Sequence, residues 1–109
     1  MVSAELALAV PSVLLVLAIC LTALALGVDQ VRVADAARVG ARAASRGEPP
    51  ALVEELVRSR TPEGSAVSVR HDREGVVVQV RAPGRVRLLP ALPVASAEAS
   101  ARWEPGAEP

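Results

Sequence analysis

The chain of 109 residues contains no lysine, phenylalanine or tyrosine, and only one each of cysteine, histidine and tryptophan. Because Cys20 is alone, this chain can form neither an intrachain disulfide nor a zinc cluster of cysteine and histidine ligands. Its twelve basic residues, all arginine, are balanced by twelve acidic residues, so the positive excess that is typical of nucleic-acid-binding domains is missing. The composition argues against nucleic acid as a partner.

Sequence motifs that carry catalysis are also missing. The sequence has no arrangement of Ser, His and Asp, no glycine-rich phosphate loop and no spacing that is typical of zinc ligands. His71 is the one candidate, and its place beside Asp72 at the end of a predicted strand favours a surface or turn role. We therefore expect a protein that is not an enzyme, with no catalytic residues, metal site, cofactor or small-molecule substrate.

The most prominent feature that is present is a long apolar segment. Residues 6–28 carry no charge, and 23 residues at about 1.5 Å each extend roughly 34 Å, enough to cross a hydrocarbon core of about 30 Å. Pro11 removes a backbone donor from this segment and predicts a helix kink there. A transmembrane helix over residues 1–28 is predicted. The alternative, a buried helix of a soluble protein, is disfavoured because the rest of the chain is too small to surround it.

Two signal-peptide interpretations compete with the membrane anchor. The stretch "LAIC", which ends at Cys20, is similar to a lipoprotein cleavage box, and "ALA" at residues 23–25 is similar to an ordinary cleavage site. Both would require a basic start and a shorter apolar core, whereas this segment follows Glu5. They predict a secreted or lipidated binding domain whose mature form lacks residues 1–19 or 1–25.

Helical character continues past the apolar segment, over residues 29–46, and Gly47 followed by two prolines ends it. Small side chains recur here at spacings of three and four residues: Ala34, Ala37, Ala41 and Ala44. Such a stripe lets helix backbones approach closely, so we expect this exposed continuation to pack against the head, against identical neighbours, or both. Asp35 is expected to pair with Arg38 on the helix surface.

The remaining sequence, residues 51–104, predicts a small α+β head. Residues 51–60 form an amphipathic helix, whose apolar face comprises Leu52, Val53, Leu56 and Val57. The segments "SAVSVRH" and "VVVQVRA" alternate on either side of "DREG", which predicts a β-hairpin in which Gly75 supplies a positive φ. The alternating segment "VASAEASARWE" predicts a third strand, and residues 105–109 are expected to be a flexible tail.

The predicted fold class is therefore α+β. A long N-terminal α-helix, transmembrane in its first half, is followed by a short second helix and a small three-stranded antiparallel β-sheet. Three short strands need their apolar face covered, so we expect it to pack against the second helix and the alanine stripe of the long helix. A band of arginines lies on the strands: Arg70, Arg73, Arg81, Arg85 and Arg87. It could contact anionic headgroups or a partner's acids, but solvation and edge protection are the more usual role.

An acid at position five, ahead of an apolar helix that contains a proline and continues into a long exposed helix, resembles the type IV pilin N-terminus. "MVSAELALAVPSVLLVLAI" in particular is similar to the TadE family of pilin-like proteins from tight-adherence (Flp) pilus systems. "VADAARVGARAASRGEP" and "VASAEASARWEP" extend the match over most of the chain. The resemblance implies a pilin-like fold and a minor pilin or pseudopilin, a structural subunit in pilus assembly and cell adhesion. Its partners would be other pilin subunits, pilus assembly proteins, membrane lipid and a prepilin peptidase.

The resemblance also implies a role for Glu5. In that family a peptidase cuts after a glycine and leaves the acid at mature position five, so Glu5 would pair with the amino terminus at Met1, its own or that of a neighbouring subunit. Alternatively, Glu5 lies at headgroup level and only favours the positive end of the helix dipole. No basic leader or glycine precedes Met1, so either the chain is the processed form or its start has been placed too late.

For localisation, the resemblance implies a single-pass protein of the cell membrane with an extracytoplasmic head. Four arginines closely follow the span, and by the positive-inside rule they favour a cytoplasmic C-terminus: Arg32, Arg38, Arg42 and Arg46. A basic leader would counter them. The alternative function is a single-span membrane protein whose extracytoplasmic head binds or regulates a partner.

Overall fold

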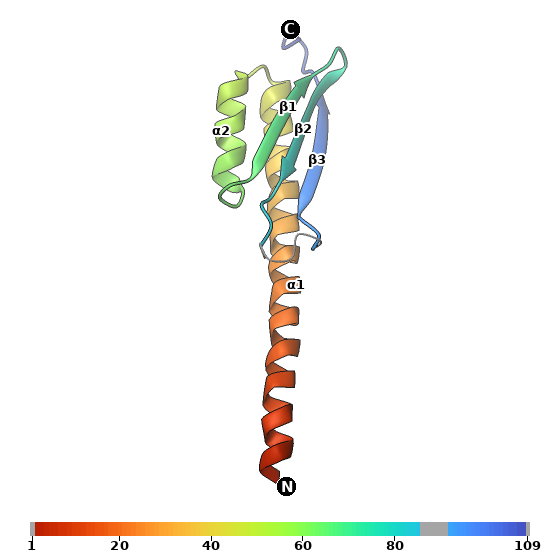
Figure 1. The fold of residues 1–109 in the computed structure, drawn as a ribbon. Coiled ribbons are helices and arrows are strands. Elements are labelled where there is room, and N and C mark those ends of the chain that lie inside the picture. Colours follow the sequence, from red (N-terminus) through yellow and green to blue (C-terminus); the bar gives the residue numbers. More distant parts are fainter. Residues whose placement is uncertain (1, 86–91, 109) are drawn as a thin grey trace.

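The chain forms a long helical stem that carries a small head around its C-terminal half (Figure 1). The computed structural model describes residues 2–85 and 92–108, and the molecule measures 76 × 20 × 20 Å. The stem is α1, Val2–Ser45, and the head consists of the end of α1, the helix α2 and a three-stranded antiparallel sheet. The predicted α+β class, with one long helix, one short helix and three strands, is confirmed.

The long helix α1 ends where the sequence predicts. Gly47 adopts a φ of 90°, a left-handed conformation that glycine enters at little cost. The Gly47 N–H donates to the carbonyl of Ala44 at 3.0 Å, and the Glu48 N–H donates to that of Ala43 at 3.4 Å. These two bonds form a Schellman motif, which satisfies the last carbonyls of the helix. The chain then turns back, and α2 begins at the second proline.

The second helix, α2, spans Pro50–Arg60 and packs beside the upper part of α1 (Figure 1). Its buried side chains are Val53 and Val57, while Leu56 is half-buried. The predicted apolar face is too wide, because Leu52 is 53% exposed and points away from the core. Asp35 of α1 reaches Arg60 of α2 at 3.9 Å rather than the predicted partner Arg38. The cation that pairs with Asp35 therefore comes from α2, whereas the three-residue spacing within α1 predicted Arg38.

The sheet consists of β1 (Ala66–His71), β2 (Gly75–Arg81) and β3 (Ser96–Arg102), with β2 in the centre. Both pairings are antiparallel, and Val78 of β2 is opposite Val69 of β1 and Ala99 of β3. Period-two alternation places valines of β2 and alanines of β3 on the face that packs against the helices. The residues of this face in β2 and β3 are Val76, Val78, Val80, Ala97, Ala99 and Ala101.

Gly75 corrects a prediction. The positive-φ residues of the described chain are three glycines, Gly47, Gly64 and Gly106, and Gly75 is not among them. Gly75 instead begins β2, where a Cβ would overlap the backbone carbonyl oxygen of Ala101. The hairpin is closed by the Asp72 N–H, which donates to the Gly75 carbonyl at 2.7 Å. Glycine is needed at this position because β3 approaches closely, and not because of the turn.

The core of the head is built from valine and alanine. It joins one side of α1, the inner face of α2 and the inner face of the sheet, and its α1 residues are Val33, Ala36, Ala37, Ala41, Ala43 and Ala44. Gly40 lies at the contact between the two helices and the sheet, where an added Cβ would meet Val57 and come within 3.4 Å of Val78. Of the predicted alanine stripe, Ala37, Ala41 and Ala44 lie in this core, while Ala34 is half-buried outside it. These small side chains allow the close approach of α1 to β2 and β3.

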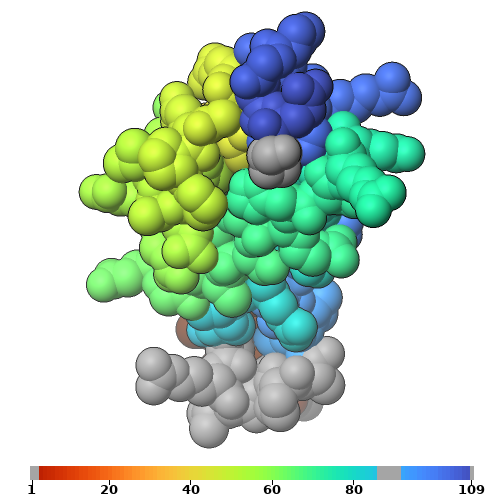
Figure 2. Space-filling model, turned by 90° about the horizontal axis from the view of Figure 1, so that it is seen from above, coloured from red at the N-terminus to blue at the C-terminus, as the bar shows by residue number. Residues whose placement is uncertain are grey.

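The C-terminal residues close the upper end of the head. The Glu104 N–H donates to the carbonyl of Ser45 at 3.0 Å, and Ala107 lies against Gly47. Viewed from above, these residues, in blue, lie beside the yellow end of the helices (Figure 2). Of the predicted tail over residues 105–109, Ala107 therefore packs on the end of α1, while Pro105, Gly106 and Glu108 are exposed.

Candidate functional site

The first candidate site is the apolar part of α1, residues 3–28, which extends beyond the head (Figure 1). Within the described chain, this is the one helix long and apolar enough to cross a membrane, and none of its most apolar window is buried. Its large apolar side chains from Leu6 to Leu24, and that of Val28, are 50–76% exposed, and Leu26 is half-buried. A helix that exposes apolar side chains on every side needs an apolar environment that this chain does not itself supply.

The predicted site residues of the stem lie near its free end. Glu5 is in the first turn of α1 and exposed. Met1 lies outside the described residues, so the pairing of Glu5 with an amino terminus stays a prediction. Pro11 lies within the continuous helix, and the Ser12 hydroxyl donates to the Leu8 carbonyl at 2.9 Å. The kink predicted at Pro11 likewise stays a prediction.

The second candidate site is the place where the head meets the stem, which we call the junction: Asp29, Gln30, Arg85 and Ser96. Asp29 follows directly after the apolar segment, yet its side chain is only 3% exposed. The Arg85 guanidinium covers it, donating from Nε to Oδ2 at 2.7 Å and from Nη2 to Oδ1 at 2.8 Å. This two-point geometry suits a planar guanidinium and a carboxylate, and it fixes both groups.

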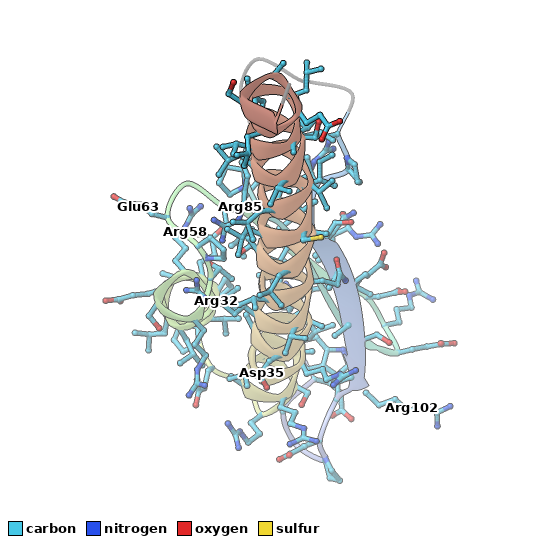
Figure 3. All side chains as sticks on the ribbon, turned by 90° about the horizontal axis from the view of Figure 1, so that it is seen from below. Arg32, Asp35, Arg58, Glu63, Arg85 and Arg102 are labelled. Atoms are coloured by element: carbon cyan, nitrogen blue, oxygen red, sulfur yellow. The ribbon has the colours of Figure 1, made fainter. Side chains whose placement is uncertain are left out.

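The charge of Asp29 is maintained by its neighbours. The hydrogen bond from Arg85, with the positive charges of Arg85 and Arg32, lowers the pKa of the Asp29 carboxyl below its ordinary value, although burial acts in the opposite direction. Seen from the free end of the stem, Arg32, Arg58 and Arg85 lie on the side of α1 where α2 lies, and Arg102 lies on the other side (Figure 3). Asp29 is therefore ionised at neutral pH.

Gln30 makes the other half of the junction. Its side-chain Nε2 donates to the Ser96 carbonyl at 2.8 Å, and its Oε1 accepts from the Ser96 N–H at 3.2 Å. The amide thus bonds to both backbone groups of one residue at the start of β3, as a neighbouring strand would. Two successive residues of α1 hold the segment after β2, through Arg85, and the start of β3, through Ser96, to the same helix turn.

The junction was not predicted from the sequence. The sequence predicts Asp29 and Gln30 to be the first residues of an exposed helix, and Arg85 to belong to a solvated arginine band. The band is not uniform, because Arg70 lies 3.6 Å from Glu98 while Arg85 binds Asp29, and Arg87 lies outside the described residues. The available sequence signal was the abrupt appearance of "DQ" after 23 uncharged residues.

His71 has a local structural contact. Its ring stacks on that of Trp103, with ring centroids 5.4 Å apart and an angle of 22° between the planes. The indole Nε1 of Trp103 donates to the Asp72 carbonyl at 2.7 Å. These contacts join the β1–β2 hairpin to the end of β3. Among the described residues, no group of three or more His, Cys, Asp or Glu side chains could hold a metal ion.

Fold and site together define a single-helix stem-and-head protein whose stem could span a membrane. The chain is 41% identical over 102 residues to the protein named Apoptosis inhibitor Rv3655c of Mycobacterium tuberculosis (strain ATCC 25618 / H37Rv), a match that covers 94% of this chain and 78% of that protein. The chain belongs to the family of that protein. No protein-family model and no solved structure matches it.

Proposed function

We propose that this protein is a membrane-anchored minor pilin or pseudopilin of the TadE type, a structural subunit in the assembly of a tight-adherence type IV pilus. Its head would lie on the extracytoplasmic side. The observation that carries the proposal is the continuous helix Val2–Ser45, whose first half is apolar and exposed on all sides while its second half forms part of the core of the head.

The free energy of moving apolar side chains out of water favours a role in which lipid or protein always covers the stem. Moving one leucine, valine or isoleucine side chain out of water is worth about 1.5–3 kcal/mol, and more than ten such side chains are exposed along α1. Lipid provides this environment for an isolated subunit. A bundle of identical stems provides it in a fibre, so one helix serves both the membrane-bound and the assembled state.

Glu5 supports an assembled state in particular. An ionised carboxylate costs up to ~3 kcal/mol at the centre of a bilayer unless it is paired. Because Glu5 lies in the first turn of α1, directly before the apolar segment, a nearby cation would lower this cost. The amino terminus of a neighbouring subunit is the partner that would both neutralise the charge and set the stagger between stems.

The proposal is tested with Glu5→Ala. The variant should insert into the membrane like the wild-type chain, because it loses only a charge, but it should be depleted in sheared pili relative to the membrane fraction. Glu48→Ala is the matched control, since it removes an exposed acid beyond the other end of α1. Normal incorporation of the Glu5→Ala chain into pili would contradict the intersubunit role.

The mass of the native membrane-bound protein tests the form of the anchor. A mass that begins at Met1 and carries an added methyl group is expected for a processed pilin. A mature chain that begins at Cys20 or at Leu26 would instead support the lipoprotein or signal-peptide interpretation. Codons upstream of Met1 that encode basic residues and end in glycine would likewise support the pilin.

A second candidate function is favoured by the name of the relative. If this chain also inhibits apoptosis, the activity would belong to an anchored head that binds a partner. Cell-death assays with purified full-length protein discriminate the two roles. Inhibition that persists in Glu5→Ala would assign that activity to the head, independent of stem assembly, and its absence in the wild-type chain would exclude it.

A further inference from the structure

Part of the head lies alongside the apolar stem, on the stem side of the junction. Arg85 and Ser96 are held at Asp29 and Gln30, yet Leu92 and Pro93, which lie between them in sequence, line a groove together with earlier residues of α1. The α1 residues of this groove are Ala18, Ile19, Thr22, Ala23 and Leu26. The head therefore continues past the junction and along the segment that could span a membrane.

The rise of the helix gives the depth of this contact. Leu26 precedes Asp29 by about 4.5 Å along the axis and Ala18 precedes it by about 16 Å, at about 1.5 Å per residue. The polar headgroup layer on each side of a bilayer is only about 5–7 Å thick. If Asp29 and its arginine lie in that layer, the groove that Leu92 and Pro93 line crosses its boundary with the hydrocarbon.

We propose that Leu92 and Pro93 contact phospholipid acyl chains at this boundary, so that the head rests on the bilayer which the stem crosses. This inference depends on the membrane anchoring proposed above. The occupant is lipid because the groove is continuous with the exposed apolar surface of α1 and its surface is almost wholly apolar. Non-helical backbone that is exposed to lipid does not occur within the hydrocarbon, so a contact near the membrane surface suits this segment, and Pro93 has no N–H to leave unsatisfied.

The junction supports this placement. Arg85 is half-exposed and bonded to Asp29, so a cation stands where anionic headgroups would be found, while the apolar pair reaches past it. Leu92 is half-buried and Pro93 is exposed, so both keep surface that lipid can cover. The proposed contact adds a second membrane-binding element to the stem.

The test uses the full chain in vesicles of phosphatidylcholine and phosphatidylglycerol, with an environment-sensitive fluorophore on a single cysteine. Native Cys20 is exposed on the stem and reports whether α1 is in lipid. In a Cys20→Ala background, Leu92→Cys and Pro93→Cys report the proposed contact. Leu52→Cys is the matched control, because it replaces an exposed leucine of α2 that does not line the groove. Trp103 fluorescence verifies that each head is folded.

We expect probes at residues 92 and 93 to be quenched by a nitroxide near the glycerol end of the acyl chain and to be protected from iodide. The probe at residue 52 should show the opposite pattern. Iodide quenching at residues 92 and 93 with lipid quenching at Cys20 would overturn the inference while the anchor stands. Iodide quenching at Cys20 would overturn both. Probes at residues 92 and 93 that are protected from both quenchers would identify a second copy of the chain as the occupant and would overturn the lipid contact.

Discussion

At the residue scale, the attachment of the head to the stem depends on the charge of one residue, Asp29, whose role the composition does not reveal. Asp29 lies at the boundary between the apolar stem and the head, and its carboxylate is satisfied by Arg85. A carboxylate without a partner would be costly at a position so well shielded from water. This cost explains why Asp29 and Arg85, 56 residues apart in sequence, meet through two hydrogen bonds. The pair fixes the head in place because the Asp29 carboxylate, only 3% exposed, depends on Arg85 for its hydrogen bonds.

This pair predicts a pH dependence. Because the folded-state pKa of Asp29 is lowered, its contribution to stability should be complete above the ordinary carboxyl pKa, about 4, and lost as the pH falls further through the folded value. Melting of the full chain in detergent, followed by Trp103 fluorescence, should show Asp29→Asn less stable than wild type at pH 7. That difference should shrink in strong acid. Asp35→Asn, whose ion pair is exposed and loose, should change little at either pH.

Glycine positions supply a second prediction at this scale. Gly75→Ala would place a Cβ against the Ala101 backbone, which cannot move without disrupting β3, so the free energy of unfolding should fall by about 3 kcal/mol. Gly84→Ala is the control, because nothing lies within 4 Å of the added atom. Chemical denaturation of both variants in detergent measures the difference. Equal stability of the two variants would contradict the close approach of β3 to Gly75.

At the scale of elements, the sequence specifies local structure well and long-range contacts poorly. Hydrophobic periodicity predicts α1, α2 and all three strands, and Gly47 with the prolines after it gives the end of α1. Periodicity also predicts the inner face of β2. It does not show whether a glycine is needed for a positive φ or for the close approach of a neighbouring strand, as β3 approaches Gly75. The partners of Asp29 and Gln30 are 56 and 66 residues away, and no local pattern encodes them.

The attachment of β3 to α1 can be tested through Gln30. Gln30→Ala removes both hydrogen bonds to Ser96, each worth about 0.5–1.5 kcal/mol. Because this contact is exposed, the effect should be local: faster amide hydrogen exchange at Ser96, with little change at Val78 in the core. Gln79→Ala, on the exposed face of β2, should leave the exchange of Ser96 unchanged. An equal increase at Val78 would show that the junction supports the whole head.

At the scale of the whole molecule, the stem and the head have separate requirements. Every buried apolar residue of the described core, from Val33 to Ala95, lies after the apolar segment. A chain that begins at Asp29 should therefore fold without detergent and keep the Trp103 fluorescence and far-ultraviolet circular dichroism of the head. The full-length protein should require detergent or lipid. A shortened chain that is unfolded would show that the stem contributes to folding of the head. The test is demanding because a small core of valine and alanine stabilises a domain only weakly.

The position of the junction also has a mechanical consequence. Gly47 and the turn after it connect the upper end of the head covalently to α1, while Asp29 and Gln30 fasten its lower end almost 20 residues earlier, roughly 27 Å along the helix axis. A load applied along the helix cannot peel the head away from one end. It must shear both fastenings and the alanine packing between them at once, which makes the upper half of the stem the most strongly reinforced part of the rod.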